Sequence, residues 1–146
     1  MWWWILGCGH RPPIAETRWP TPHGDLVMAC ALDTCNLALD GAGRPVPLAQ
    51  DLWIPTEVSG SLRQPQEGVW LLRTTEGDAC PSRYRLVCPA VPDVSRPFGN
   101  CGELSNGIDG AKPLVRFDAD RDANRHAMVF QLDPEACAAR EVPAGD

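Results

Sequence analysis

The chain has almost no lysine and no long apolar run. Lys112 is the single lysine among 13 basic residues, and the net charge is −6. The arginines are spread singly and form no basic stripe, which argues against nucleic acid as a partner. An acidic chain also has no attraction to an anionic membrane surface. No apolar run approaches the roughly 18 residues of a membrane span, so we expect membrane contact only through a covalent lipid.

Long helical patterns are also missing. The chain contains 15 prolines and 13 glycines, and they interrupt every apolar period of helical spacing. Short apolar runs alternate with turn residues instead, at residues 26–31, 36–39, 45–48, 52–54, 68–73, 83–88, 114–117 and 127–132. This spacing predicts a mostly β protein, a small antiparallel β-sandwich or barrel.

The length of 146 residues fits one domain with its own core. We interpret residues 1–24 as a signal remnant followed by a flexible arm. Residues 8–24, which form the arm, are rich in proline and polar residues and have no periodic spacing of apolar residues. The β-rich domain then covers residues 25–146. A short C-terminal helix is predicted after Asp133, because Asp133 can cap it and Pro134 suits its first position.

Ile5-Leu6-Gly7-Cys8 follows three consecutive tryptophans. It resembles the lipobox of bacterial lipoproteins, in which a signal peptidase cuts before a cysteine whose sulfur receives a lipid. The resemblance implies lipidation at Cys8 and a signal that would begin upstream of Met1. It further implies an exported protein, either periplasmic or an outer-membrane lipoprotein of a bacterium.

With Cys8 set aside, six cysteines remain, an even number typical of a disulfide framework in an oxidising compartment. Cys30 and Cys35 flank a short link between two apolar runs, and a hairpin there would place their sulfurs opposite each other. We pair Cys80 with Cys101 and Cys88 with Cys137, although the sequence leaves other pairings open. Buried free thiols and a zinc site are the alternatives, and the chain has no second closely spaced pair for zinc.

An acidic segment at residues 118–124 has oxygen-bearing side chains at alternate positions, which is the spacing of the first ligands in a calcium-binding loop. The loop positions that an EF-hand reserves for glycine and glutamate hold Ala123 and Val129. A polar hairpin connection is therefore the favoured interpretation, and calcium, or a carbohydrate bound with its help, is the alternative. The candidate ligands are Asp118, Asp120, Asp122 and Asn124.

Catalytic motifs give no positive support for an enzyme. His126 is the single histidine near the predicted domain body, and Ser105 is not framed as a nucleophile elbow. A hydrolase using His126 with Ser105 or a free cysteine therefore stands as the least favoured hypothesis. No catalytic residue and no resident cofactor is predicted.

Three aromatic residues are candidates for recognition: Trp53, Trp70 and Tyr84. Aromatic side chains are enriched at binding surfaces, although in a β domain a tryptophan more often belongs to the core. Together these patterns predict a non-enzymatic exported binding protein of inhibitor, immunity or envelope-accessory type. Its expected partner is another envelope or secreted protein, bound through the loops between Cys80 and Ser105.

Overall fold

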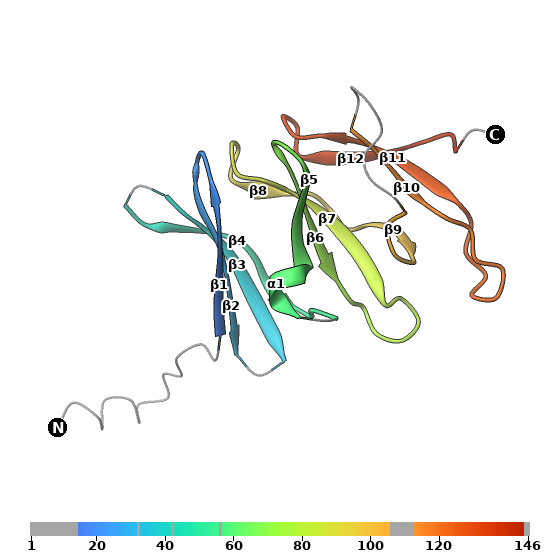
Figure 1. Cartoon of the computed structure of the whole chain (residues 1–146), viewed down its shortest axis with the longest axis horizontal. Helices are drawn as coiled ribbons and strands as arrows, with labels where there is room; N and C mark the ends of the chain where they lie inside the picture. Colours follow the sequence, from blue (N-terminus) through green and yellow to red (C-terminus); the bar gives the residue numbers. More distant parts are fainter. Residues whose placement is uncertain (1–14, 32, 42, 56, 106–112, 145–146) are drawn as a thin grey trace.

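The computed structural model describes residues 15–144 except 32, 42, 56 and 106–112. In this part of the chain, short strands form three antiparallel sheets (Figure 1). Sheet A contains β1 (Ala15–Thr21), β2 (Gly24–Ala31), β3 (Thr34–Asp40) and β4 (Pro45–Leu52). Sheet B contains β5 (Leu62–Gln66), β6 (Val69–Thr74), β7 (Ser82–Cys88), β8 (Asp93–Val94) and β9 (Phe98–Cys101). Sheet C contains β10 (Leu114–Phe117), β11 (Met128–Asp133) and β12 (Ala138–Val142).

Sheet B lies between the other two sheets (Figure 1). Strand β6 shows why, because neighbouring residues point to opposite faces of a strand. Trp70 and Leu72 belong to a core shared with sheet A, whereas Val69 and Leu71 belong to a core shared with sheet C. All four are buried, so the first four positions of this strand are apolar and neither face of the strand is open to solvent there. The protein is therefore a stack of three sheets with two cores.

The core between sheets A and B, called core 1 below, is mainly aliphatic. Sheet A contributes alternate residues of β2 and β3, among them Leu26, Met28 and Leu37, none more than 1% exposed. Their neighbours in the sequence, such as Asp25 and Asn36, lie on the outer face. Because neighbouring residues of a strand point to opposite faces, the position of each apolar residue along these strands decides whether it faces sheet B.

The core between sheets B and C, called core 2 below, is aromatic. It contains Tyr84 and all three phenylalanines, with ring centroids 5.0–6.5 Å apart: Phe98, Phe117 and Phe130. Gly99 lies against this cluster with φ +117°, and an added Cβ would stand 3.1 Å from the ring of Phe117. Glycine is needed there because any side chain would collide with the ring in a conformation that already disfavours L-residues.

All six cysteines of the expected framework are paired, and the three expected pairs are confirmed: Cys30–Cys35, Cys80–Cys101 and Cys88–Cys137. The first links two directly opposed residues of β2 and β3. The second ties the β6–β7 loop to β9. The third joins sheet B to the turn between β11 and β12, so it is the disulfide that crosses between two sheets.

The prediction of a mostly β, antiparallel, disulfide-containing fold is confirmed, but the C-terminal helix is wrong. The carboxylate of Asp133 does accept hydrogen bonds from the amides of Glu135 and Ala136, at 3.1 and 3.2 Å, as a helix cap would. The chain then leaves the helical path at Cys137, whose φ is +51°. Residues 138–142 pair with β11 instead, because that pairing covers core 2.

The prediction that residues 8–24 form a flexible arm is wrong for residues 15–24. These residues form β1 and the turn into β2, and β1 pairs with β2 along its whole length. Trp19 packs against core 1, whereas Glu16 and Arg18 are exposed. A strand with so much polar sequence gives little local signal, because its stability comes from pairing at the edge of an existing sheet.

Candidate binding surface

Part of the segment predicted to bind a partner lies at one end of the molecule, which we call the loop end, whereas the β7–β8 turn at residues 89–92 lies at the opposite end of β7. The loop end comprises Trp53, the β6–β7 loop at residues 75–81, β9, and the β10–β11 hairpin loop at residues 118–127. A hollow of about 430 Å³ lies between the last three parts, with Ala79, Asn100 and His126 among its lining residues.

The helix α1 (Val58–Ser61) has four residues, and no helix in the described residues is long and apolar enough to span a bilayer.

The β6–β7 loop is held by its own backbone and by a disulfide. The amide of Glu76 donates to the carbonyl of Cys80 at 2.9 Å, and the amide of Cys80 donates to the carbonyl of Gly77 at 3.1 Å. Cys80 is then bonded to Cys101, whose φ is +74°. A non-glycine residue in the left-handed region needs support from its surroundings, and the disulfide provides a fixed anchor there. The loop is thus a rigid presentation site.

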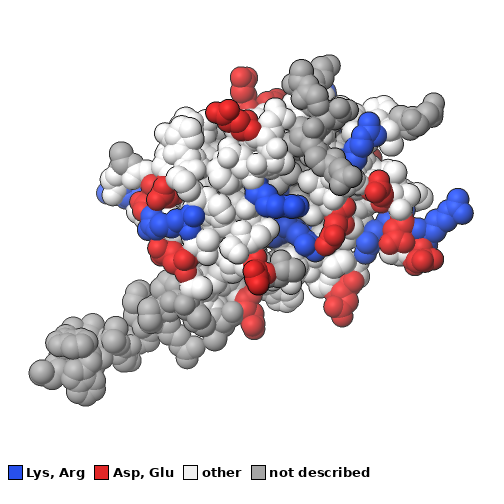
Figure 2. Space-filling view, in the orientation of Figure 1, with Lys and Arg blue, Asp and Glu red and all other residues white. Residues whose placement is uncertain are grey.

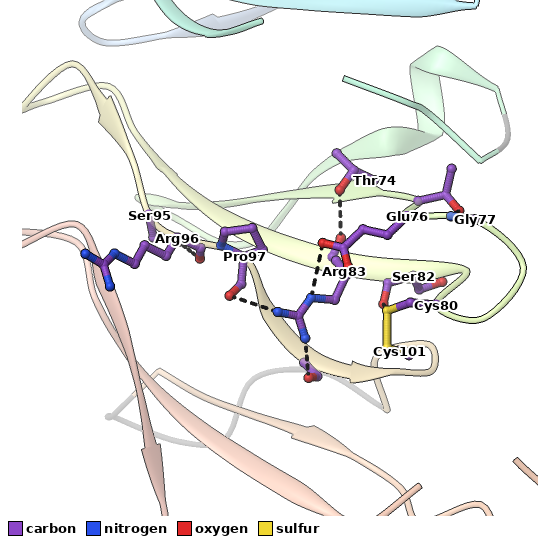
Figure 3. Close-up of polar contacts among 12 residues, drawn as sticks. Thr74, Glu76, Gly77, Cys80, Ser82, Arg83, Ser95, Arg96, Pro97 and Cys101 are labelled. Atoms are coloured by element: carbon purple, nitrogen blue, oxygen red, sulfur yellow. Dashed lines mark hydrogen bonds and ion pairs between the residues drawn. A yellow bond between two sulfur atoms is a disulfide. The ribbon is translucent and has the colours of Figure 1, made fainter. Parts of the chain in front are cut away.

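Arg83 fixes the segment that leads into β9 (Figure 3). Its guanidinium donates to the carbonyls of Gly99 at 3.0 Å and Pro97 at 3.4 Å. On its other side it lies 3.7 Å from the carboxylate of Glu76. One partly buried side chain of β7 therefore connects the β6–β7 loop with β9. Sequence reasoning missed this role, since an isolated arginine carries no signal of its partners.

Asn100 joins β9 to the β10–β11 hairpin loop. Its side-chain amide donates to the carbonyls of Asp118 at 2.8 Å and His126 at 2.9 Å, while its side-chain oxygen accepts from Gly102 at 3.0 Å. The bonds to Asp118 and His126 hold both ends of the hairpin loop, and the bond from Gly102 fixes the orientation of the amide. Asparagine between glycine and cysteine in a predicted turn indicates hydrogen bonds from the side chain to the backbone. The sequence around it does not show that its partners lie in the distant β10–β11 hairpin loop.

The acidic segment at residues 118–124 forms a hairpin connection, as the favoured interpretation predicted. Asp120 and Arg125 exchange two backbone hydrogen bonds, at 3.0 and 2.8 Å. One carboxylate oxygen of Asp120 accepts from the amides of Asp122 and Ala123 at 3.1 and 3.3 Å. Asn124 closes the turn with φ +56°, which asparagine tolerates well. In the described residues no group of three or more acidic, histidine or cysteine side chains is placed to hold a metal. Calcium binding by these side chains stays a prediction.

His126 and Ser105 are not arranged as a nucleophile and its base. Ser105 lies along one edge of β10, where its amide donates to the carbonyl of Arg116 at 2.9 Å. His126 lies just before β11, which pairs with the other edge of β10. The Ser105 hydroxyl is buried whereas His126 is exposed, and no hydrogen bond joins these two described side chains. The geometry gives a hydrolase no support.

The three aromatic candidates separate clearly. Trp53 is 54% exposed, whereas Trp70 and Tyr84 are 6% and 2% exposed. Trp70 and Tyr84 are therefore core residues, which is the placement that the sequence analysis called more frequent in a β domain: Trp70 packs in core 1, and the Tyr84 hydroxyl accepts a hydrogen bond from the amide of Leu104 at 3.1 Å within core 2. Trp53 lies beside the β6–β7 loop, because its carbonyl accepts from the amide of Thr75 at 2.8 Å.

The loop end carries more carboxylates than arginines, although Arg121 and Arg125 lie among the acidic residues of the β10–β11 hairpin loop. The exposed carboxylates of the loop end are Glu76, Asp78, Glu103, Asp118, Asp120 and Asp122. Three of them face arginines, in the pairs Glu76–Arg83, Glu103–Arg73 and Asp120–Arg125, at 3.7, 3.1 and 4.0 Å. The other three form no ion pair within the described residues. Figure 2 shows acidic and basic side chains interspersed on one face without a continuous basic stripe, which agrees with the sequence analysis.

The lipobox-like residues, including Cys8, lie outside the described residues. No known protein family, curated protein or solved structure matches this chain.

Proposed function

We propose that this protein is an exported, non-enzymatic binding protein whose loop end docks a basic surface of another envelope or secreted protein. Export and lipidation at Cys8 follow from the lipobox resemblance and agree with an oxidising compartment, where three disulfides persist. An inhibitor, immunity or envelope-accessory role needs a rigid surface rather than a catalytic group.

The observation that carries the proposal is the exposed Trp53 beside a loop that is covalently anchored. A tryptophan is the side chain that most often dominates an interface, and it binds best when its surroundings are preorganised. Here the disulfide Cys80–Cys101, the Arg83 contacts and the Asn100 contacts fix the surroundings. The exposed carboxylates of Glu76 and Asp78 on the neighbouring loop favour a cationic partner and speed its association.

The Trp53→Ala variant tests this surface. We expect the wild-type protein, crosslinked in an envelope extract at low salt, to capture a partner that the variant loses, with at least a tenfold drop in affinity for the purified pair. Val91→Ala is the matched control, because Val91 is also exposed, at 43%, but lies in the turn between β7 and β8. Equal capture by all three proteins would rule out the loop end as the docking site.

The compartment is tested by mass spectrometry of the native protein. Alkylation without reduction is expected to label none of the six bridged cysteines, and reduction exposes all of them. Lipidation of Cys8 adds the mass of the lipid, and the peptidase cleavage that accompanies it removes the residues before Cys8. Reduced cysteines in protein freshly isolated from its host would overturn the exported assignment.

A further inference from the structure

Proline and bulges interrupt most of the sheet edges in this protein. Strand β4 carries Pro45 and Pro47 and has an irregular register, and β5 carries Pro65 with another irregularity. Strand β8 has only two residues. Natural proteins use these features to prevent unwanted strand pairing. An edge strand that has no bulge and keeps free backbone amides on its open side is therefore informative.

Two further edges are blocked in other ways. Strand β10 is covered on its outer side, because the segment at residues 104–105 pairs with it. Strand β12 has Glu141 directly opposite Phe130 of core 2, so Glu141 is on the inner face of the sheet. An inward-facing charge at an edge discourages an added strand.

The edge of β1 is open. It pairs with β2 in seven consecutive positions without a bulge, and no described strand pairs with its other side. Its one proline, Pro20, is expected to turn its nitrogen away from β2, because proline cannot donate to the ladder. Backbone groups alternate in direction along a strand, so the amides of Glu16 and Arg18 share that free side. These amides are available to an added strand.

The outer face beside this edge is acidic. Arg18 faces three carboxylates, those of Glu16, Asp25 and Asp40, at 3.2, 3.4 and 3.1 Å. One guanidinium against three carboxylates leaves an excess of negative charge around the edge. A basic side chain on an incoming strand would complete this set of charges, since opposite charges on neighbouring strands attract.

A hollow of about 470 Å³ opens where β1 ends. Its lining includes Pro20 and His23 of sheet A, and Glu67, Trp70 and Ala90 of sheet B. The inner face of β1, which carries Trp19, faces sheet B, so a strand that continues past Trp19 would direct alternate side chains toward this hollow. Strand addition obtains affinity from backbone bonds and specificity from such pockets.

We infer that the free edge of β1 is a second binding surface, which takes an extended basic segment of another protein as an added strand and one apolar side chain of that segment in the hollow beside Trp70. This inference rests on the proposed role as a binding protein, but it does not depend on the loop end.

The probe is a synthetic peptide of about nine residues with lysine at alternate positions, threonine between them and one leucine near an end. Binding is followed by NMR together with amide hydrogen exchange. In the free protein, the amides of Glu16 and Arg18 are expected to exchange fast, and saturating peptide should slow their exchange at least tenfold. A peptide with glutamate in place of lysine is expected to bind at least tenfold more weakly.

Variants at Glu16 and Ala90 separate what the backbone, the charge and the pocket each contribute to peptide binding. Glu16→Pro removes both the free amide and the carboxylate, whereas Glu16→Ala removes the carboxylate alone, so Glu16→Pro should weaken binding further, by at least tenfold. Ala90 is exposed, and Ala90→Phe should fill the hollow without disturbing a core. It is expected to weaken the leucine peptide but not a peptide with alanine at that position. Thermal melts confirm that each variant is folded.

The inference is overturned if the lysine peptide binds no better than the glutamate peptide, or if protection develops on other strands. Sedimentation that shows a dimer, with the same two amides protected in the absence of peptide, would also overturn it, because the edge would then be occupied by a second copy. Trp53→Ala is expected to leave peptide binding unchanged. Failure of the loop end is thus distinguishable from failure of this edge.

Discussion

Core 1 and core 2 share sheet B but are held together differently. Core 1 is aliphatic, and no disulfide crosses it, because Cys30 and Cys35 belong to the same sheet. Core 2 is aromatic, and the Cys88–Cys137 disulfide connects its two sheets. Sheet C is the smallest of the three sheets, with three strands against four in sheet A and five in sheet B. Sheet A is therefore held on sheet B by packing, whereas sheet C is held by packing and by a covalent bond.

The same difference separates the two proposed surfaces. The loop end is built on sheets B and C and is fixed by the Cys80–Cys101 disulfide and the bonds of Asn100. The β1 edge belongs to sheet A and is fixed only by pairing with β2 and by packing against core 1. Reduction should therefore impair the loop end before it affects the edge.

The largest effect is expected from removing the bond between sheets B and C. Cys88→Ala combined with Cys137→Ala should lower the free energy of unfolding by about 4 kcal/mol, because the two cysteines are 49 residues apart and the freed loop is long. Cys30→Ala combined with Cys35→Ala, with a separation of 5 residues, should cost only about 2 kcal/mol. Urea unfolding measures both.

Hydrogen exchange on these variants sharpens the comparison. Without the Cys88–Cys137 bond, amides of β10 to β12 should lose protection while those of β2 and β3 keep theirs. Equal loss of protection in sheets A and C would show that the two cores unfold as one unit and would contradict the difference drawn here.

The next largest loss of stability is expected from changing one of two neighbouring leucines, each of which belongs to a different core. Leu71 packs in core 2 and Leu72 in core 1, and both are nearly fully buried, at 3% and 0% exposed. Either residue changed to alanine should destabilise the protein by about 3 kcal/mol, since each leaves a cavity. Leu72→Ala should loosen sheet A and Leu71→Ala should loosen sheet C, as measured by amide exchange. The same pattern in both variants would be inconsistent with a three-layer stack.

The smallest effect is expected at the surface of sheet A. The hydrogen bond to Asp40, with a further one to Glu16, raises the pKa of the exposed Arg18. A raised pKa means that this contribution to stability is fully present below the ordinary arginine pKa and is lost only as pH rises through the raised value. Arg18→Gln should therefore lower Tm slightly and by a constant amount from neutral to moderately alkaline pH.

Salt provides the control for this last variant. The contribution of an exposed ion pair is screened at high ionic strength, so the difference in Tm between Arg18→Gln and the wild type should shrink in about 1 M salt. A difference that stays unchanged in salt would assign the effect to packing of the arginine stem instead of its charge.

Sequence patterns identified the strands that contain a short apolar run. Strands β2, β3, β4, β6, β7, β10 and β11 were predicted from such runs. Strands β1, β5, β8, β9 and β12 were missed. Their sequences are polar or contain proline and glycine, and they are strands because a neighbouring strand offers them a free ladder.

The candidate site was predictable only in part. The pairing of Cys80 with Cys101 and the hairpin at residues 118–124 followed from local turn patterns. The exposure of Trp53 and the burial of Trp70 did not, since both are flanked by apolar residues. Their difference comes from position: Trp70 lies inside a central strand, and Trp53 follows the last residue of β4.

The amino-acid sequence by itself determined the β class and indicated a set of three disulfides, because prolines and glycines interrupt every long helical pattern and the six cysteines lie at turns and strand ends; the structure then fixed which cysteines pair. Only the tertiary structure decided that sheet B is covered on both faces, that Asp133 caps one turn instead of a helix, and that β1 has a free edge. These features depend on which surfaces remain uncovered after the sheets have packed, and no local pattern contains that information.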